Sequence, residues 1–384
     1  MSDAKISMDP EKEINKIGFG FLRLPQVEDK EDKKICDWEK INKLVDRYFE
    51  LGGKYIDTAY TYLDGQSEMA VRKCVVERKP RDSFFLSEKL PGYLCKSYED
   101  CEKYFQEELE RCGVDYFDVF MLHWLNQKNY AIAEKNDEFR FLREKKEQGL
   151  AKRIGFSFHD SAELLDEILT KHPEIDVVLI QVNFLDWDSA GIESGKCYDI
   201  VMKHGKKVFV MEPVKGGSLA SLPEEAEEYL RGVHPDWTPS DWALRFVQSL
   251  PGVELCLSGM NELAHIEANL KKFHPFNDQE KEALFHVRGI IESQTAVPCT
   301  GCRYCVSHCP MNIPIPEFFK MYNEKKRYPQ DGWKIIPTYR QMTQTCGKAS
   351  DCIECHSCEQ HCPQHIPIAE KILRVKYSFE RDLV

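Results

Sequence analysis

Short runs of apolar and β-branched residues recur along most of this chain, spaced about thirty residues apart. Between these runs the apolar positions follow helical spacing, as at Ile41, Leu44, Val45 and Tyr48. An alternation of strand-like and helix-like segments predicts repeated βα units. The predicted strands are Lys16–Gly20, Lys54–Ala59, Ser83–Lys89, Phe117–Leu122, Arg153–Phe156, Val177–Val182, Lys207–Met211 and Glu254–Leu257.

Eight strands that alternate with helices favour a (β/α)8 TIM barrel, an α/β fold. A doubly wound sheet is the alternative. The first predicted strand is followed by Phe21-Leu22-Arg23-Leu24-Pro25 and not by the G-x-G-x-x-G turn that holds a pyrophosphate in doubly wound dinucleotide-binding folds. The barrel is therefore the preferred interpretation.

Cysteines carry the clearest chemical pattern in the chain. Eight of the sixteen form two runs with the spacing C-x₂-C-x₂-C-x₃-C-P. In bacterial ferredoxins, three cysteines of such a run hold one cubane and the fourth ligates the other cluster. The sequence therefore predicts two [4Fe-4S] clusters with crossed ligation. The first is assigned to Cys299, Cys302, Cys305 and Cys362, and the second to Cys309, Cys352, Cys355 and Cys358.

A pair of zinc knuckles is the alternative for these runs, but zinc sites normally use two separated C-x₂-C pairs. Cys346 precedes the second run and is interpreted as a spare thiol, since that run is complete without it. The remaining seven cysteines show no ligand spacing and are expected to be buried thiols. They are Cys36, Cys74, Cys95, Cys101, Cys112, Cys197 and Cys256.

We expect a barrel domain at residues 1–295 and a small α+β ferredoxin-like domain at residues 296–384. The long separation between the cysteine runs, which contains residues 314–316 and 328–332, is expected to be an inserted helix and loop. The apolar runs are too short to cross a bilayer, and Met1–Glu13 is mostly polar, so a cytoplasmic protein without a membrane partner is expected. The formal net charge of -12 argues against nucleic acid as a partner.

Polar residues stand at or just after the carboxyl ends of three successive predicted strands, where barrel enzymes place their chemistry. Asp57 and Lys89 stand at two of these ends, Tyr62 lies in the loop after Asp57, and His123 follows the next strand. Any one of them alone is more often structural. Four together predict a shared catalytic pocket.

These residues resemble the aldo-keto reductase family. The segment Asp57-Thr58-Ala59-Tyr60-Thr61-Tyr62 is similar to its D-T-A-x-x-Y motif, and the resemblance covers roughly residues 14–275. Together with the cysteine runs it resembles a ferredoxin-fused branch found mainly in anaerobes. The resemblance implies reduction of an aldehyde or ketone, or the reverse reaction, with NADH or NADPH. It implies cofactor contacts at Gly20, Ser157, Gln181, Met211, Gly217, Ser258, Gly259 and Asn269.

The expected chemistry suits these residue types. A hydride delivered to a carbonyl leaves an alkoxide, so Tyr62 is expected to donate a proton. We expect Lys89 to lower the pKa of Tyr62, Asp57 to hold the Lys89 ammonium, and His123 to orient the carbonyl oxygen.

Two classes of function follow. In the first, the chain is a nicotinamide-dependent reductase that exchanges electrons with a ferredoxin or flavoprotein. In the second, it is an iron–sulfur electron-transfer adaptor whose barrel binds a carbonyl ligand without turning it over. The intact set of four favours the first. Because His265 stands where relatives often carry Arg, NADH is expected to compete well with NADPH.

Overall fold

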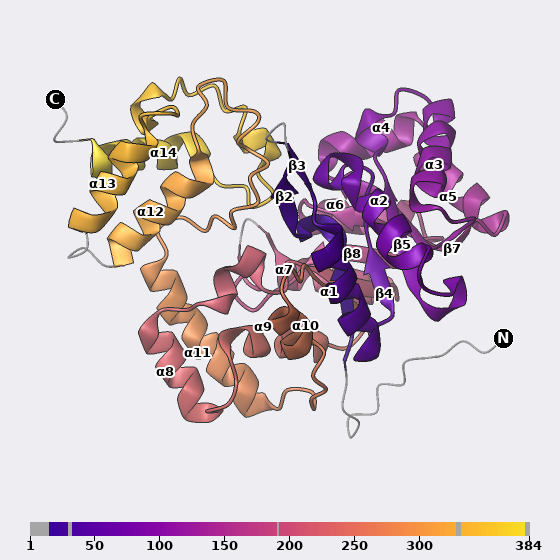
Figure 1. Ribbon diagram of the computed structural model, residues 1–384, viewed down its shortest axis with the longest axis horizontal. Coiled ribbons are helices and arrows are strands. Elements are labelled where there is room, and N and C mark those ends of the chain that lie inside the picture. The colour runs from indigo at the N-terminus through magenta and orange to yellow at the C-terminus, as the bar shows by residue number, and fades with distance from the viewer. Residues whose placement is uncertain (1–14, 30–32, 190–191, 328–331, 381–384) are drawn as a thin grey trace. The chain divides into compact units, whose positions relative to one another are not determined.

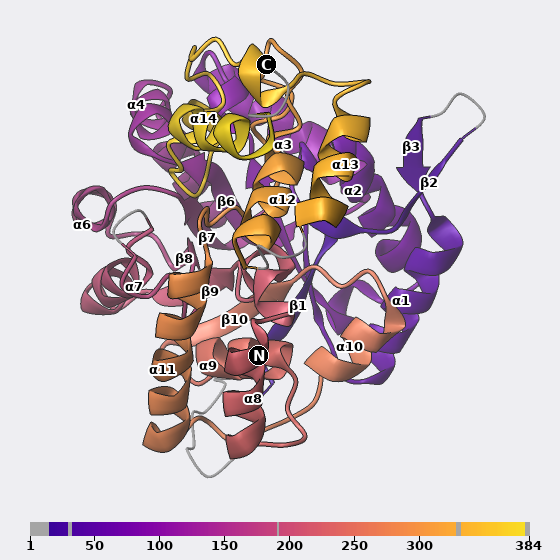
Figure 2. The same cartoon turned by 90° about the vertical axis from the view of Figure 1, so that its left-hand side faces the viewer.

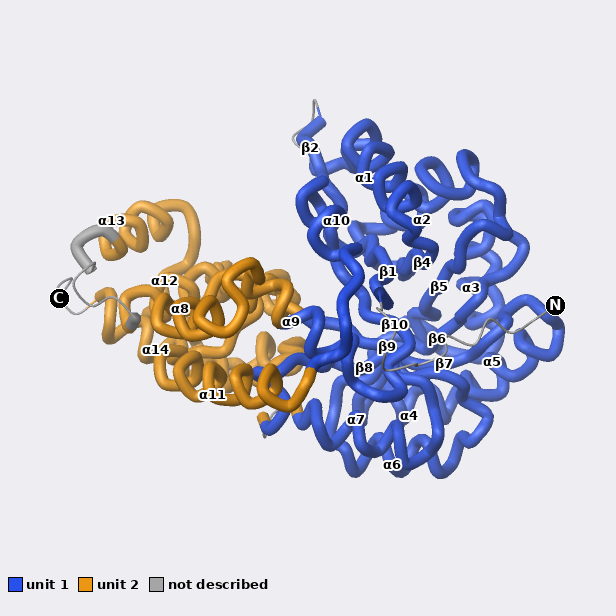
Figure 3. Tube along the Cα trace, turned by 90° about the horizontal axis from the view of Figure 1, so that it is seen from below, with its two compact units in different colours: residues 1–188, 193–213, 243–276 blue, residues 189–192, 214–242, 277–384 orange. Residues whose placement is uncertain are grey.

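The computed structural model describes residues 15–29, 33–189, 192–327 and 332–380. These residues fall into two compact units, which Figure 3 distinguishes by colour. Unit 1 comprises residues 1–188, 193–213 and 243–276, and unit 2 comprises 189–192, 214–242 and 277–384. The expected boundary near residue 295 stays a prediction. The segment Val214–Trp242 lies well before the cysteine runs in the sequence but belongs to the same unit as those runs.

Unit 1 is built around a closed barrel of eight parallel strands, in the order β1-β10-β9-β8-β7-β6-β5-β4 (Figure 1). The barrel confirms the fold class predicted from the sequence. Its strands are β1 (Ile17–Gly20), β4 (Tyr55–Asp57), β5 (Phe85–Leu90), β6 (Phe117–Leu125), β7 (Ala151–Phe158), β8 (Val177–Gln181), β9 (Lys207–Met211) and β10 (Val253–Ser258).

Helices follow most of these strands, and each helix has one apolar face, which it buries. In α1, Asp37 accepts a hydrogen bond from the Lys40 amide and caps the helix, while Ile41, Leu44 and Val45 are buried. The helices of this unit are α1 (Trp38–Glu50), α2 (Gln66–Ala70), α3 (Tyr98–Cys112), α4 (Gln127–Lys135), α5 (Glu138–Glu147), α6 (Ala162–Lys171), α7 (Ser194–Lys203), α10 (Leu263–Asn269) and most of α9 (Pro239–Gln248).

Side chains fill the barrel interior, so it is a packed core. Val119, Leu179, Phe209 and Leu255 belong to one buried cluster drawn from four strands. The sequence did not predict the two-stranded sheet of β2 (Gln26–Glu28) and β3 (Lys34–Cys36), which pair antiparallel.

Helices supply the regular structure of unit 2: α8 (Glu224–Val233), α11 (Asp278–Gln294), α12 (Ile315–Arg327), α13 (Gly332–Met342) and α14 (Ile368–Phe379). Helix α12 contacts both α13 and α14, and Figure 2 shows this group. Phe318, Tyr339 and Phe379 stack in its core, where the Tyr339 hydroxyl donates to Glu380 at 2.5 Å.

The small domain with the cysteine runs was expected to contain strands as well as helices. Its described residues after 297 form helices and turns, with no assigned strand. The expected insertion between the cysteine runs falls on α12 and α13, while residues 328–331 lie outside the described part of the chain. Among the described residues, no helix is both long enough and apolar enough to cross a membrane.

Candidate active site and cysteine-lined cavities

A buried ion pair lies at the carboxyl ends of neighbouring strands of the barrel. The Lys89 ammonium of β5 donates to both carboxylate oxygens of Asp57, the last residue of β4, each at 2.8 Å. It also donates to the Thr58 carbonyl at 2.6 Å, and the Ser87 hydroxyl donates to Asp57 at 2.7 Å. Lys89 is fully buried, so these partners compensate for the hydration that its charge loses.

Tyr62 and His123 lie beside this pair. The Lys89 Nζ atom is 4.8 Å from the centroid of the Tyr62 ring, and the rings of Tyr62 and His123 are 5.6 Å apart at 79°. The structure thus brings together all four residues that the sequence singled out. Their catalytic roles stay a prediction.

Burial and the Asp57 charge raise the pKa of Tyr62 well above its ordinary value of 10.0. We had expected Lys89 to lower this pKa. The Lys89 ammonium is balanced by two bonds to Asp57, and its nitrogen faces the ring of Tyr62. Tyr62 is therefore a protonated phenol at neutral pH, which is the form that can donate a proton.

His123 is held in its neutral form. Burial, and then the positive charges of Lys89 and His159, lower its pKa well below 6.5. Its Nδ1 atom is buried without a hydrogen-bond partner among the described residues. A neutral imidazole can donate one N–H to a carbonyl oxygen without adding a charge to the pocket.

Backbone strain collects at the same ends of the strands. Non-glycine residues with left-handed backbone follow three of them: Leu63 (φ 52) and Asp64 (φ 56) after β4, Trp124 (φ 61) at the end of β6, and Glu212 (φ 56) after β9. Each costs on the order of 1–2 kcal/mol. Strain of this kind is concentrated at functional sites, where the surrounding structure enforces it.

Sequence reasoning missed one aromatic wall of this site. Tyr93, in the turn after β5, lies 5.9 Å from the His123 ring and 5.6 Å from Trp124, measured between ring centroids. Its position just past a strand end was the available signal. Trp187 packs on Tyr198 and Phe246.

The residues expected to bind the nicotinamide cofactor lie mostly at two places in unit 1. Ser157 is the last residue but one of β7, whereas Gln181 and Met211 end the adjacent strands β8 and β9 and pair in register with each other. Ser157 accepts a hydrogen bond from the Trp124 amide at 2.7 Å. The Gln181 amide donates to Asp186 at 3.0 Å.

The second place is where β1 and β10 end. Asn269 donates to the Ser258 hydroxyl at 3.1 Å, and a Cβ atom at Gly20 would lie 3.6 Å from the Ser258 carbonyl. Gly259, the next residue, packs against the side chain of Arg23. Gly217 belongs to unit 2, and its expected contact with the cofactor stays a prediction.

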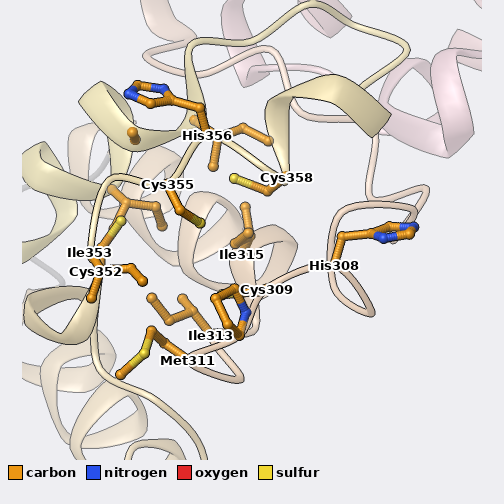
Figure 4. A pocket seen from close by; sticks show the side chains of 14 residues that line it. His308, Cys309, Met311, Ile313, Ile315, Cys352, Ile353, Cys355, His356 and Cys358 are labelled. Carbon is orange, nitrogen blue, oxygen red and sulfur yellow. The ribbon is translucent and has the colours of Figure 1, made fainter.

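Two cavities in unit 2 are lined by the eight cysteines of the runs. The first contains Cys299, Cys302, Cys305 and Cys362, and we call it cavity I. The second, cavity II, contains Cys309, Cys352, Cys355 and Cys358, and Figure 4 shows it with Ile313 and Ile315 beside the thiols. These are the two crossed sets that the spacing predicted. Ligation by these thiols stays a prediction.

The loops around both cavities repeat the same backbone conformation. Left-handed residues occur at Gly301, Arg303 and Asn312, and again at Glu354, His356 and His365, with the same offset that separates the two cysteine runs. Backbone N–H groups of Gly301 and Glu354 donate to the sulfurs of Cys299 and Cys352. Amides directed at sulfur suit thiolates that hold a cluster, because they stabilise the negative charge.

The two cavities differ in exposure. Cavity II includes the exposed Cys355, next to the 61% exposed Ile353, whereas the thiols of cavity I are buried or partly buried. The spare thiol, Cys346, lines neither cavity and donates to the Met342 carbonyl.

All seven remaining cysteines are buried, as predicted. Two of them meet, which their spacing did not predict: Cys95 and Cys101 lie near Glu138, and the ligand atoms of the three residues lie within 4.8 Å of one another. A second such group consists of Glu68, Glu88 and Cys112.

Fold and site together define a barrel of the oxidoreductase class that carries an iron–sulfur module. The chain belongs to the Aldo/keto reductase family, whose profile matches residues 16–287, and the 4Fe-4S dicluster domain profile matches residues 298–366. An aldo-keto reductase of Mycobacterium avium is 24% identical over 173 residues, covering 45% of this chain and 54% of that protein. The match spans about half the length of that relative.

Solved structures agree on the fold. The holo form of aldo-keto reductase AKR11C1 from Bacillus halodurans has a TM-score of 0.59 at 21% identity, covering 72% of this chain and 96% of its own. An aldo/keto reductase from Klebsiella pneumoniae in complex with NADP and acetate has a TM-score of 0.58 at 18% identity, covering 71% and 91%. At these identities the likeness establishes the barrel fold.

Proposed function

We propose that the barrel reduces an aldehyde or ketone to an alcohol, or catalyses the reverse reaction, and that unit 2 carries two [4Fe-4S] clusters. The observation that carries the first part is the buried Lys89–Asp57 pair beneath the Tyr62 ring, with His123 at its edge. Burying a charged pair costs free energy, so such pairs are often found where they serve a function. This pair lies beside a phenol and an imidazole that are in the forms able to donate hydrogen bonds.

In the proposed reaction, a bound nicotinamide cofactor supplies or accepts the hydride. Tyr62 donates its phenol proton to the carbonyl oxygen in the reducing direction and accepts it back in the other. Asp57 fixes the Lys89 ammonium against the Tyr62 ring, where its charge stabilises a phenolate as the proton leaves. His123 donates a hydrogen bond to the same oxygen.

The residues at the strand ends fit such a cofactor. Ser157, Gln181 and Met211 offer two polar groups and one thioether on adjacent strands, which suits a carboxamide beside an apolar ring face. Gly20 leaves room against the Ser258 carbonyl. The solved Klebsiella pneumoniae structure, which is in complex with NADP, supports a nicotinamide cofactor. His265 is exposed on α10, so NADH is proposed to compete well.

Tyr62→Phe tests the barrel chemistry. Loss of the phenol proton should lower carbonyl turnover about 10²- to 10⁴-fold while NADH and NADPH still bind. Tyr60→Phe is the matched control, because Tyr60 lies in the same motif but donates to Glu107 at 2.8 Å. Equal turnover in both variants would remove Tyr62 as the proton donor.

The clusters are tested by metal content. Anaerobically purified protein should contain about eight irons per chain. Cys362→Ser should damage the cluster of cavity I although Cys362 lies in the second run, and Cys346→Ser should leave the iron content unchanged. Zinc in place of iron would contradict the proposal, and loss confined to the cluster of cavity II would contradict crossed ligation.

The clusters would transfer single electrons, whereas a nicotinamide exchanges two as a hydride. We therefore propose a ferredoxin or flavoprotein as the electron partner, and the exposed rim of cavity II at Ile353 and Cys355 supports an external donor. The adaptor function is the alternative. It predicts cluster reduction by such a donor with no carbonyl turnover in the wild-type protein, measured in one anaerobic stopped-flow experiment.

A further inference from the structure

The segment that follows β9 is buried against cavity I. Lys215 is only 2% exposed, and its ammonium donates to the side-chain oxygen of Gln364 at 2.9 Å. Gln364 lies two residues after Cys362, one of the four thiols of cavity I. Gly216 adopts a left-handed conformation (φ 63), and a Cβ atom there would lie 2.4 Å from the Thr300 carbonyl, one residue beyond Cys299. Lys215 and Gly216 therefore lie against residues that neighbour Cys362 and Cys299 of cavity I.

The charge of Lys215 acts on that thiol set. The Lys215 ammonium is among the charges that act on Cys299, and it favours negative charge there. An ammonium that favours a thiolate also favours any further negative charge placed on the same site.

Cavity II has the opposite surroundings. The carboxylate of Glu354 acts on Cys352, and Glu359 acts on Cys358. Glu359 also acts on Cys362 of cavity I, so it does not distinguish the two sites. Arg303 also lines cavity I, but it is exposed and paired with Glu317. The asymmetry between the cavities is therefore assigned to the buried Lys215 at one and to Glu354 at the other.

Reduction of a [4Fe-4S] cluster with four thiolates adds one electron and takes its net charge from about −2 to about −3. A buried cation stabilises the reduced form more than the oxidised form, because the interaction grows with the charge and is weakly screened in the protein interior. A nearby carboxylate has the reverse effect.

We propose that Lys215 raises the reduction potential of the cluster in cavity I above that of the cluster in cavity II. An electron from a low-potential ferredoxin or flavoprotein enters at the exposed cavity II and comes to rest on the buried cluster. Lys215 is a positioning and charge-setting residue here, and the inference rests on the iron–sulfur part of the proposed function.

The test is an anaerobic redox titration of the full-length holoprotein with dithionite, followed by electron paramagnetic resonance. Cys302→Ser and Cys355→Ser assign the two cluster signals to cavities I and II. Lys215→Met removes the charge while keeping an unbranched side chain, and Lys215→Arg restores the charge. Lys281→Met removes the same charge from α11, where Lys281 pairs with Asp278.

Lys215→Met should lower the equilibrium constant for reduction of cluster I about tenfold, equivalent to about 59 mV for a one-electron couple. Cluster II should shift less than about twofold, Lys215→Arg should restore most of the potential, and Lys281→Met should leave both clusters unchanged. If Lys215→Met loses iron, Lys215→Gln, which keeps a donor for Gln364, takes its place.

An unchanged cluster I potential in an iron-replete variant would overturn the inference, as would equal shifts in both clusters. Lys215→Arg separates a packing role from a charge role, because it keeps the positive charge but changes the shape of the side chain. If this variant does not keep the reduction potential of the cluster in cavity I, the proposal is contradicted. The iron content of the wild-type protein is measured before any titration. If that protein binds no iron, the proposed cluster function itself is wrong, and this outcome is distinct from a failure of the inference about Lys215.

Discussion

Replacing Asp57 with Asn keeps the shape of the side chain but removes the charge that balances the buried Lys89 ammonium. Lys89 and Asp57 are 0% and 3% exposed at their side chains, so water cannot take over the role of the lost carboxylate. Breaking a buried pair from one side costs about 3–5 kcal/mol of unfolding free energy. The Thr58 carbonyl still accepts from Lys89, which places the expected loss near the lower end, at about 3 kcal/mol.

A double-mutant cycle isolates the pair. Lys89→Met alone leaves the Asp57 carboxylate buried with only the Ser87 hydroxyl, so it should also destabilise the fold by about 3 kcal/mol. The double variant Asp57→Asn with Lys89→Met leaves no unbalanced charge and should lose less than about 2 kcal/mol. The coupling energy between the two positions should therefore exceed about 4 kcal/mol.

Guanidinium unfolding of the anaerobic holoprotein, followed by circular dichroism, measures these free energies. Glu39→Gln is the surface control, because it removes the partner of Lys43 in a pair whose side chains are 82% and 64% exposed, and it should cost less than about 1 kcal/mol. A coupling energy near zero between positions 57 and 89 would refute the reasoning. So would an Asp57→Asn protein as stable as the wild type.

Three further predictions concern pH. Because folded His123 resists protonation and the unfolded imidazole takes up a proton near pH 6.5, stability should fall as the pH drops below 6.5, and His123→Gln should flatten this fall in unfolding experiments. Since the pKa of Tyr62 lies well above 10.0, the phenol keeps its proton between pH 7 and 10, and the rate of carbonyl reduction should not fall in this range through loss of that proton. The rate is measured against pH in the wild-type protein and in the Tyr60→Phe control. Burial, with the charges of Glu88 and Glu68, raises the pKa of Glu108 well above 4.5, so its stabilising contribution is complete below pH 4.5 and is lost as the pH rises; Glu108→Gln should raise the melting temperature more at pH 8 than at pH 5, and an equal rise at both would contradict this.

The barrel could be predicted because its strands are buried on both sides and therefore stand out as apolar runs. The predicted Lys207–Met211 matches β9 at both ends, and Val177–Val182 differs from β8 by one residue. The β2–β3 sheet gave no such signal, since its strands have three residues each and Val27 is 44% exposed.

The four site residues were predictable from their places at strand ends, yet their electrostatics were not. The raised pKa of Tyr62 depends on complete burial and on the bidentate geometry of Lys89 with Asp57, which no spacing encodes. The same holds for Lys215. Its place beside Gln364 depends on a contact between segments about 150 residues apart in sequence, and only the folded chain brings them together.

A closed barrel has a consequence for how copies of this chain meet one another. Every strand of the barrel is paired on both sides, so it offers no backbone edge to which a strand from another molecule could add. Among the described residues, open edges remain at the β2–β3 sheet, whose outer positions include the charged Glu28 and Lys34. Short strands and charged residues of this kind oppose edge-to-edge aggregation. The β2–β3 sheet therefore has open edges that are poorly suited to pairing with another molecule.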